Sequence, residues 1–194
     1  MKKKEIIYFD KPGPKNTEEV IKAVLKLVNE SDISYVVVAS TRGYTAVAMA
    51  ESLKDANVTV ICVAEHSGFV GDDTQLLMEE NRQKLEKMGA KILIGSHVLS
   101  GIERSVSKKF GGLSHVETIA HTLRQFGTEG IKVAVEISIM ASDAGLIPTD
   151  REVIAVGGTG KGADTAVVLQ PAHMNNYFDL EIREIIAKPR QRES

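Results

Sequence analysis

The sequence predicts an α/β fold built on a mostly parallel open sheet. Four short apolar runs, typical of strands that are covered on both faces, lie at residues 35–40, 58–64, 91–95 and 152–156. Segments with helical periodicity separate these runs, and strands joined through helices become parallel neighbours. The 194 residues are enough for one such domain with a sizeable core, so we expect a single domain over residues 1–194.

Local signals place the helices. Asn16 with Glu19 predicts a capped helix start, after a strand at 4–9, and Ser114 with Glu117 forms a second capping box. We expect further helices at 45–55 and 74–88, and a long loop at 96–112. Segment 131–144 fits a strand by alternation and a helix by spacing. Gly145 lies where a helix would end, which favours a mostly buried helix.

The C-terminal part predicts a change of strand direction. A strand at 165–169 follows the fourth run so closely that it must return antiparallel. Phe178, Leu180 and Ile182 alternate with charged residues, which predicts a last strand at the sheet edge. The sheet therefore gains extra edge strands at both termini, and a loose polar tail is expected from about 188.

Composition excludes several classes of protein. A formal net charge of -2 argues against a nucleic-acid binder. No apolar run approaches a membrane span, and the N-terminal run is too short for an export signal. The single cysteine, Cys62, lies within an apolar strand and reads as a buried thiol, which fits a cytoplasmic protein. The histidines show no metal-ligand spacing and read as surface or capping residues, apart from His66.

The turn after the first central strand carries the chemistry of a phosphate cradle. It consists of Ser40, Thr41, Arg42, Gly43, Tyr44 and Thr45. A strand that feeds a helix through such a turn directs free backbone N–H groups and the positive end of the helix dipole at one spot. The hydroxyls can donate, the arginine adds charge, and the glycine permits close approach. The alternative is an ordinary turn with Ser and Thr as caps.

A second glycine-rich loop follows the fourth central strand. Its candidate residues are Gly158, Thr159, Gly160, Lys161, Gly162, Asp164 and Thr165. If the first and fourth strands are neighbours, the two loops converge at one crevice beyond the carboxyl ends of the strands. The loop then resembles a phosphate nest. It lacks the glycine spacing of a Walker loop, and its alternative is a flexible hairpin turn.

Other polar residues have two interpretations each. Glu65 and His66 follow the second central strand and suit acid–base chemistry or ring contact, or simply a solvated loop contact. Glu136 and Asp143 lie in an apolar segment, where they are either catalytic carboxylates or one solvent-exposed helix turn.

Two segments of the chain resemble a known family. Residues 40–46 (Ser-Thr-Arg-Gly-Tyr-Thr-Ala) resemble the hydroxyl-x-Ser-Gly-x-Ser-Ala effector loop in the α/β carboxyl-terminal domain of pyruvate kinase. Residues 145–158 resemble the helix end, turn and strand that precede its second effector loop. The resemblance covers about Thr17 to Gln170 and is to the free-standing archaeal-type form. It implies a three-layer α/β/α fold with strand order 3-2-1-4-5, strand 5 antiparallel, counting from the strand at 35–40.

The resemblance also implies a function. In the full enzyme this domain binds a phosphorylated effector and does no chemistry; without the catalytic barrel, pyruvate kinase activity is not expected. Arg42 replaces a family serine, and the second loop lacks the family's tryptophan and arginine, which argues against a sugar bisphosphate. The free-standing form implies flavin mononucleotide (FMN), with its phosphate in the paired loops. Its ring would then lie against one of Tyr44, His66, Phe69 or Met140.

Three hypotheses result. The first is a small-molecule binding protein whose partner is FMN or another phosphorylated ligand, with no nucleic acid, membrane or metal. The second is a flavin- or phosphate-dependent enzyme that uses Glu65, His66 or Lys161. The third is a homo-oligomeric scaffold or regulatory subunit that associates through the apolar edge strand at 178–186.

Overall fold

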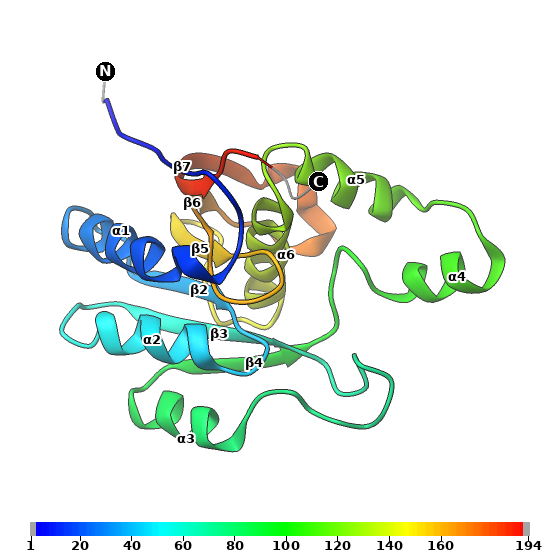
Figure 1. Ribbon diagram of the computed structural model, residues 1–194, viewed down its shortest axis with the longest axis horizontal. Helices are drawn as coiled ribbons and strands as arrows, with labels where there is room; N and C mark the ends of the chain where they lie inside the picture. The colour runs from blue at the N-terminus through cyan, green and yellow to red at the C-terminus, as the bar shows by residue number, and fades with distance from the viewer. Residues whose placement is uncertain (1–2, 192–194) are drawn as a thin grey trace.

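A seven-stranded, mostly parallel sheet crosses the protein within residues 3–191, which the computed structural model describes (Figure 1). Its strands are β1 (Ile7–Phe9), β2 (Tyr35–Ala39), β3 (Thr59–Glu65), β4 (Lys91–Gly95), β5 (Val153–Gly157), β6 (Thr165–Gln170) and β7 (Glu181–Pro189). The spatial order is β1-β7-β6-β5-β2-β3-β4, and β6 is antiparallel to both of its neighbours. The stretch β4-β3-β2-β5-β6 confirms the predicted order, including its antiparallel fifth strand.

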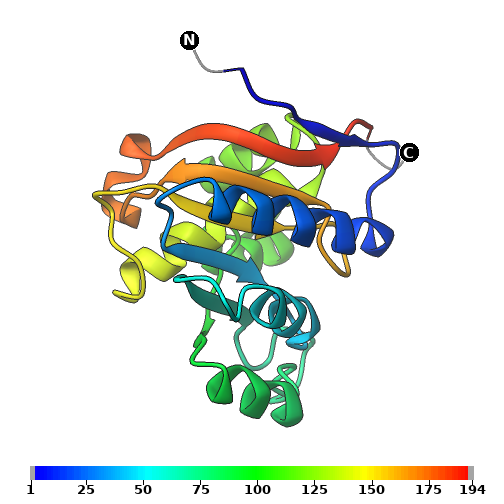
Figure 2. The same ribbon diagram turned by 90° about the vertical axis from the view of Figure 1, so that its left-hand side faces the viewer.

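The helices form layers on the two faces of the sheet. They are α1 (Thr17–Asn29), α2 (Tyr44–Ser52), α3 (Glu79–Lys87), α4 (Ile102–Phe110), α5 (His115–Arg124) and α6 (Glu129–Asp143). Helices α1, α2 and α3 cover one face, and α1 and α2 lie in front of the sheet in Figure 2. Helix α6 covers the other face, and α5 packs on α6 instead of on the sheet.

The core explains why the central strands lack polar alternation. In β2, Val36 and Val38 point into the cluster beneath α1 and α2, while Val37 points into the cluster beneath α6. Both faces of the strand are therefore dry, and apolar side chains are favoured at every position. Cys62 on β3 is also fully buried, as predicted, and burial raises the pKa of its thiol to about 12.

The ambiguous segment forms helix α6, which confirms the helical prediction. It touches β2, β5 and β6 on one side and α5 on the other, so apolar residues occur all around it and imitate strand alternation. Its first turn lies close to the end of β5, because a Cβ atom on Gly157 would come within 2.6 Å of the Gly130 carbonyl oxygen. Among residues 3–191, no helix has the length and apolarity required to cross a bilayer.

One predicted helix is shorter in the structure, and one predicted loop contains a helix. The helix expected at 74–88 is only Glu79–Lys87, because the Gln75 side chain bonds the Leu77 N–H and the Glu65 carbonyl and so replaces helical backbone bonds. The loop expected at 96–112 contains helix α4. Its apolar stripe of Ile102, Val106 and Phe110 is solvent-exposed, so burial does not reveal the helix, although the spacing does.

The predictions for the chain ends also need correction. The first strand begins at Ile7 and not at Lys4, and Asn16 does not cap α1 through its side chain. A short 3-10 turn (Pro14–Asn16) runs directly into α1, and the Asn16 side chain donates to the Lys11 carbonyl. The last strand, expected from Phe178, begins at Glu181, because Met174–Asp179 form a second 3-10 segment. Strand β7 extends through Pro189, so no loose tail begins at 188; residues 192–194 lie outside the described part.

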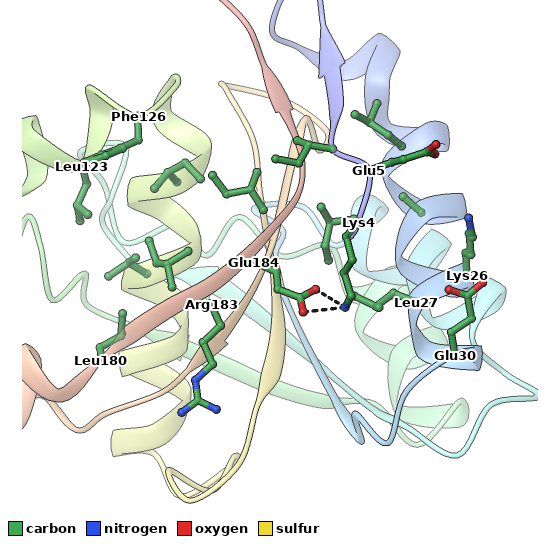
Figure 3. Close-up of a pocket in the computed structure, with 18 of the residues that line it drawn as sticks. Lys4, Glu5, Lys26, Leu27, Glu30, Leu123, Phe126, Leu180, Arg183 and Glu184 are labelled. Carbon is green, nitrogen blue, oxygen red and sulfur yellow. Dashed lines mark hydrogen bonds and ion pairs between the residues drawn. The ribbon is translucent and has the colours of Figure 1, made fainter. Parts of the chain in front are cut away.

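A groove of about 1270 Å³ runs along β7, between α1 on one side and α5 with α6 on the other. Figure 3 shows Leu27 on the α1 side and Phe126 and Leu180 on the opposite side. Strand β1 pairs only with Ala187–Pro189, so the predicted edge position is right for the first part of β7 and wrong for its end.

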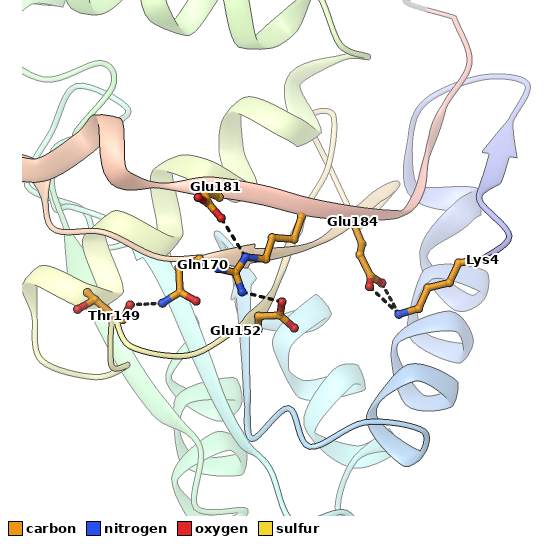
Figure 4. Close-up of polar contacts among 7 residues, drawn as sticks. Lys4, Thr149, Glu152, Gln170, Glu181 and Glu184 are labelled. Atoms are coloured by element: carbon orange, nitrogen blue, oxygen red, sulfur yellow. Dashed lines mark hydrogen bonds and ion pairs between the residues drawn. The ribbon is translucent and has the colours of Figure 1, made fainter. Parts of the chain in front are cut away.

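Ion pairs on the surface connect β7 with its surroundings (Figure 4). Lys4 bonds both carboxylate oxygens of Glu184 at 2.5 and 2.7 Å, and Arg183 bridges Glu181 and Glu152. Exposed pairs of this kind each contribute about 0–1 kcal/mol. The packing of β7 against β6 and the helices therefore dominates its stability.

Candidate functional site

A cavity of about 720 Å³ opens at the carboxyl ends of β2, β3 and β5. The turn between β2 and α2 forms one wall, and the loop between β5 and β6 forms another. Strands β2 and β5 are parallel neighbours, with Val38 opposite Val156, so their following loops leave the sheet side by side. Helix α6 supplies the floor, and the segments after β3 and β4 complete the wall.

The β2–α2 turn presents free backbone donors to the cavity. The Ser40 hydroxyl oxygen accepts from the Ala46 N–H at 3.2 Å, and the Gly43 carbonyl accepts from the Val47 N–H. No group within residues 3–191 accepts from the N–H of Tyr44 or Thr45. These free donors and the helix dipole together favour an anion at the start of α2.

Gly43 is required by packing on the side away from the cavity. Its φ of +92° is left-handed, and a Cβ atom there would lie 2.6 Å from the Asn81 Cβ and 2.9 Å from the Leu77 Cδ1. Asn81 also donates to the Arg42 carbonyl at 2.8 Å. The approach of a ligand to Gly43 stays a prediction; the structure shows that this glycine lets α3 approach the turn.

Gly43→Ala should lower the free energy of unfolding by about 2–4 kcal/mol, because it adds backbone strain and a clash with α3. Gly71→Ala is the matched control, since Gly71 also has a positive φ but no atom lies within 4 Å of its Cβ position. Urea unfolding followed by far-UV circular dichroism measures both. Equal losses in the two variants would show that the contact with Asn81 and Leu77 is unimportant.

A buried carboxylate fixes the β5–β6 loop from behind. Asp164 is fully buried and accepts from the Gly13 N–H at 3.0 Å, the Thr159 N–H at 3.1 Å and the Thr165 hydroxyl at 2.8 Å. Thr17 accepts from the backbone N–H of Ala163. Contacts from the segment before α1 thus hold the loop and direct its tip toward the cavity.

A buried ion pair lies in the floor of the cavity. Lys132 and Glu136 are one helical turn apart on α6, are 4% and 1% exposed, and meet at 2.5 Å. The second carboxylate oxygen of Glu136 accepts from the Leu99 N–H at 2.9 Å. Burial lowers the pKa of Lys132, while the neighbouring carboxylate favours its charged form. The pair thus forms part of the cavity floor and, through the Leu99 N–H, anchors the chain after β4.

Three cations of the cavity wall are unpaired. Arg42, Arg104 and Lys161 form no ion pair within residues 3–191. Arg104 lies over the ring of Phe69, with 5.5 Å between the guanidinium carbon and the ring centroid. The other cations of the wall are neutralised, Arg124 by Glu129 and Lys132 by Glu136. The excess positive charge favours an anionic ligand.

Two polar side-chain atoms in the cavity wall are buried without a partner. One is Oε2 of Glu65; its other oxygen accepts from the Thr41 hydroxyl at 2.7 Å. The other is the Ser100 hydroxyl oxygen. Buried polar groups in native proteins are nearly always bonded, so each of these atoms indicates a missing partner.

Aromatic rings flank the cavity after β3 and β4. Phe69 and His97 lie 5.1 Å apart between centroids, and both line the cavity. Burial lowers the pKa of His97, which favours its neutral form. His97 was expected on the surface or at a cap, so that expectation is wrong. Within residues 3–191, no three His, Cys, Asp or Glu side chains group as a metal site would require.

A known protein family matches the part of the chain that forms this cavity. The family described as "Pyruvate kinase, alpha/beta domain" matches residues 18–169. The chain belongs to that family. The match agrees with the extent of the resemblance, about Thr17 to Gln170, and it contains both loops and all of α6. Strands β1 and β7 lie outside the matched segment.

The structure of this pyruvate kinase α/β domain brings most of the predicted site residues together. The predicted residues that line the cavity are Ser40, Thr41, Arg42, Tyr44, Thr45, Glu65, Gly158, Gly160, Lys161 and Gly162. Of the ring contacts proposed from the sequence, Tyr44, Phe69 and Met140 also line it. The two loops of the domain therefore converge at one cavity, as the parallel pairing of β2 and β5 requires.

Five predicted residues do not line the cavity. Gly43 packs on α3, Thr159 donates to Thr128, and Asp164 and Thr165 are buried beneath the loop. His66 is half-buried and bonds the carbonyl of its neighbour Ser67; it does not line the cavity, but its ring packs edge-on against the cavity residues Phe69 and His97. Of the five residues considered for catalysis, Glu65, Glu136 and Lys161 line the cavity, whereas His66 and Asp143 do not.

The sequence indicated Met140 and Glu136 on α6, but not Lys132 or the segment after β4. Glu136 was expected to be catalytic or exposed; it is buried, so exposure is excluded. The signal was present, because Lys132 and Glu136 are four residues apart in an otherwise apolar helix. Ser100 and Arg104 carried no such signal, since only the fold places them beside the end of β3.

Proposed function

We propose that the protein binds a phosphorylated small molecule in this cavity, with FMN as the leading candidate. The observation that carries the proposal is the convergence, at one cavity, of unpaired cations and free backbone donors. Arg42 and Lys161 come from two loops that are far apart in the sequence. The phosphate would lie between them, at the start of α2.

The chemistry of this end suits a phosphate better than a carboxylate. Arg42 offers a planar fork of donors, and Lys161 is a compact charge on the opposite loop. The N–H groups of Tyr44 and Thr45 add donors with fixed directions. A tetrahedral dianion can accept from all of these groups at once, whereas a flat carboxylate has two acceptor oxygens.

The remaining space suits a flat ring such as that of a flavin. The cavity of about 720 Å³ lies within the range of pockets that hold cofactors. Phe69 and His97 supply ring contacts on one side, and Met140 supplies an adaptable apolar surface on α6. A bound flavin would supply one- and two-electron redox chemistry, and the residues named here would bind and orient it.

Titration with FMN, followed by flavin fluorescence, tests the proposal. Lys161→Ala should weaken FMN binding roughly tenfold to a hundredfold, because a charged hydrogen bond to phosphate is lost. The affinity of this variant should also depend less on salt than that of the parent, since one screened contact is gone.

Lys54→Ala is the matched control. Lys54 is an exposed lysine that follows α2 and does not line the cavity, so its loss should leave FMN affinity unchanged. If the parent does not bind FMN at all, the flavin proposal is wrong. If Lys161→Ala binds FMN like the parent at every salt concentration, the phosphate does not lie at the second loop.

A further inference from the structure

A carboxylate with one free oxygen lies in the cavity wall beside the β2–α2 turn. Glu65 is the last residue of β3, and its side chain is oriented by the Thr41 hydroxyl, which donates to Oε1 at 2.7 Å. Its backbone carbonyl accepts from Gln75 at 2.9 Å. Both contacts fix the residue, yet Oε2 is buried and has no partner. A carboxylate oxygen only accepts, so this position can receive a donor from a ligand.

Ser100 supplies a second group of complementary chemistry. Its hydroxyl oxygen is also buried without a partner, and the residue lines the same cavity. The backbone just before it is fixed, because the Leu99 N–H donates to Glu136 on α6. A hydroxyl can donate as well as accept. The wall therefore offers one acceptor, on Glu65, and one donor, on Ser100.

The protein's own cations do not satisfy Glu65. Lys132 lies in the same cavity, but it is paired with Glu136 at 2.5 Å. Arg124 is paired with Glu129 at 2.7 Å. Neither Arg42 nor Arg104 forms an ion pair with Glu65 within residues 3–191. Glu65 Oε2 therefore remains open to a donor from a ligand.

We infer that Glu65 and Ser100 recognise the imide edge of a ring, in which an N–H group is flanked by carbonyl groups. The ring N–H donates to Glu65 Oε2, and an adjacent carbonyl accepts from the Ser100 hydroxyl. The rings of Phe69 and His97 on the same wall favour a flat heterocycle over a sugar. This inference rests on the proposed function, because it names the ring that accompanies the phosphate.

The imide edge predicts discrimination between two flavins that differ by one methyl group. FMN has the ring N–H, whereas 3-methyl-FMN replaces its hydrogen by a methyl group and keeps the phosphate. The methylated ring leaves the Glu65 carboxylate buried and unsatisfied. The parent protein should therefore bind 3-methyl-FMN roughly 100-fold more weakly than FMN, or worse.

Glu65→Ala separates this inference from general effects of the methyl group. Without the carboxylate, the two flavins should bind within about threefold of each other, because nothing remains to distinguish the N–H from the methyl. Glu51→Ala is the matched control: Glu51 is exposed on α2, outside the cavity, so the parent's discrimination should persist. Circular dichroism checks that each variant is folded. If Glu65→Ala is unfolded, Glu65→Gln replaces it in the test. Its amide retains shape without charge and should reduce the discrimination about tenfold.

The outcomes distinguish this inference from the proposed function. If FMN binds the parent and 3-methyl-FMN binds equally well, the imide inference is wrong while the proposed function stands. The same holds if the discrimination is unchanged in Glu65→Ala or, where that variant is unfolded, in Glu65→Gln. If neither flavin binds the parent, flavin binding and the inference that rests on it are both wrong.

Discussion

Asp164→Ala is expected to lower the free energy of unfolding by about 3–5 kcal/mol. The carboxylate is fully buried and accepts from two backbone N–H groups and one hydroxyl. Its removal leaves the N–H groups of Gly13 and Thr159 without this acceptor and opens a cavity of carboxylate size. Each buried unsatisfied donor costs about 1–3 kcal/mol, which supports a loss of this size.

Asp164→Asn is the informative companion. The amide keeps the shape and one acceptor oxygen, so its loss should be smaller, about 1–3 kcal/mol. Urea unfolding monitored by far-UV circular dichroism suits both variants, since the chain has no tryptophan. The carboxylate contacts would prove unimportant if alanine and asparagine both unfolded at the midpoint of the parent.

Breaking the buried pair on α6 should have an effect of similar size. Lys132→Met and Glu136→Leu should each lower the free energy of unfolding by about 3–5 kcal/mol, because each leaves one buried charge uncompensated. Leu99 would also lose the acceptor for its N–H in the second variant. The double variant should recover much of this loss, because apolar side chains of similar volume avoid the cost of burying two charges.

The measurement is a double-mutant cycle by urea unfolding. The expected coupling between the two positions is favourable and exceeds the loss in either single variant, about 3–5 kcal/mol, since the double variant regains stability. Lys22 with Glu18 is the control pair, since it has the same four-residue spacing on α1 but lies on the surface. Its single replacements should change stability by less than about 1 kcal/mol. Losses on α6 that simply add would contradict the assignment of a buried, interacting pair.

The strands themselves were predictable because their causes are local: apolar runs such as Val36–Val38 mark strands that are covered on both faces. Their order was predicted from the resemblance to the pyruvate kinase α/β domain, while the helical connections indicated only that they are parallel. The convergence of the two loops then followed from the position of β5 beside β2. Helix α4 was missed because its apolar stripe, which includes Ile102 and Phe110, faces solvent.

The site was predictable only where local chemistry carried it. The hydroxyls and glycines around Arg42 and Lys161 are neighbours in the sequence, so the sequence alone indicated both loops. Ser100 became part of the cavity only through the fold. The role of Asp164 was misassigned because its partner Gly13 is 151 residues away in the chain. A polar residue beside a glycine-rich loop gives no sign of whether it faces a ligand or supports the loop from behind.

The bond between Gly13 and Asp164 has a consequence for the order in which the protein folds. It joins segments separated by 151 residues, so it closes only after most of the chain has been synthesised. Contacts of such high sequence separation form slowly, because the entropy of closing a long loop is lost first. The β2–α2 turn, whose bonds are mostly short-range, can assemble early. The loop that carries Lys161 gains its final shape late, when the segment before α1 meets the end of β5, so anion-binding capacity should appear as one of the last steps of folding.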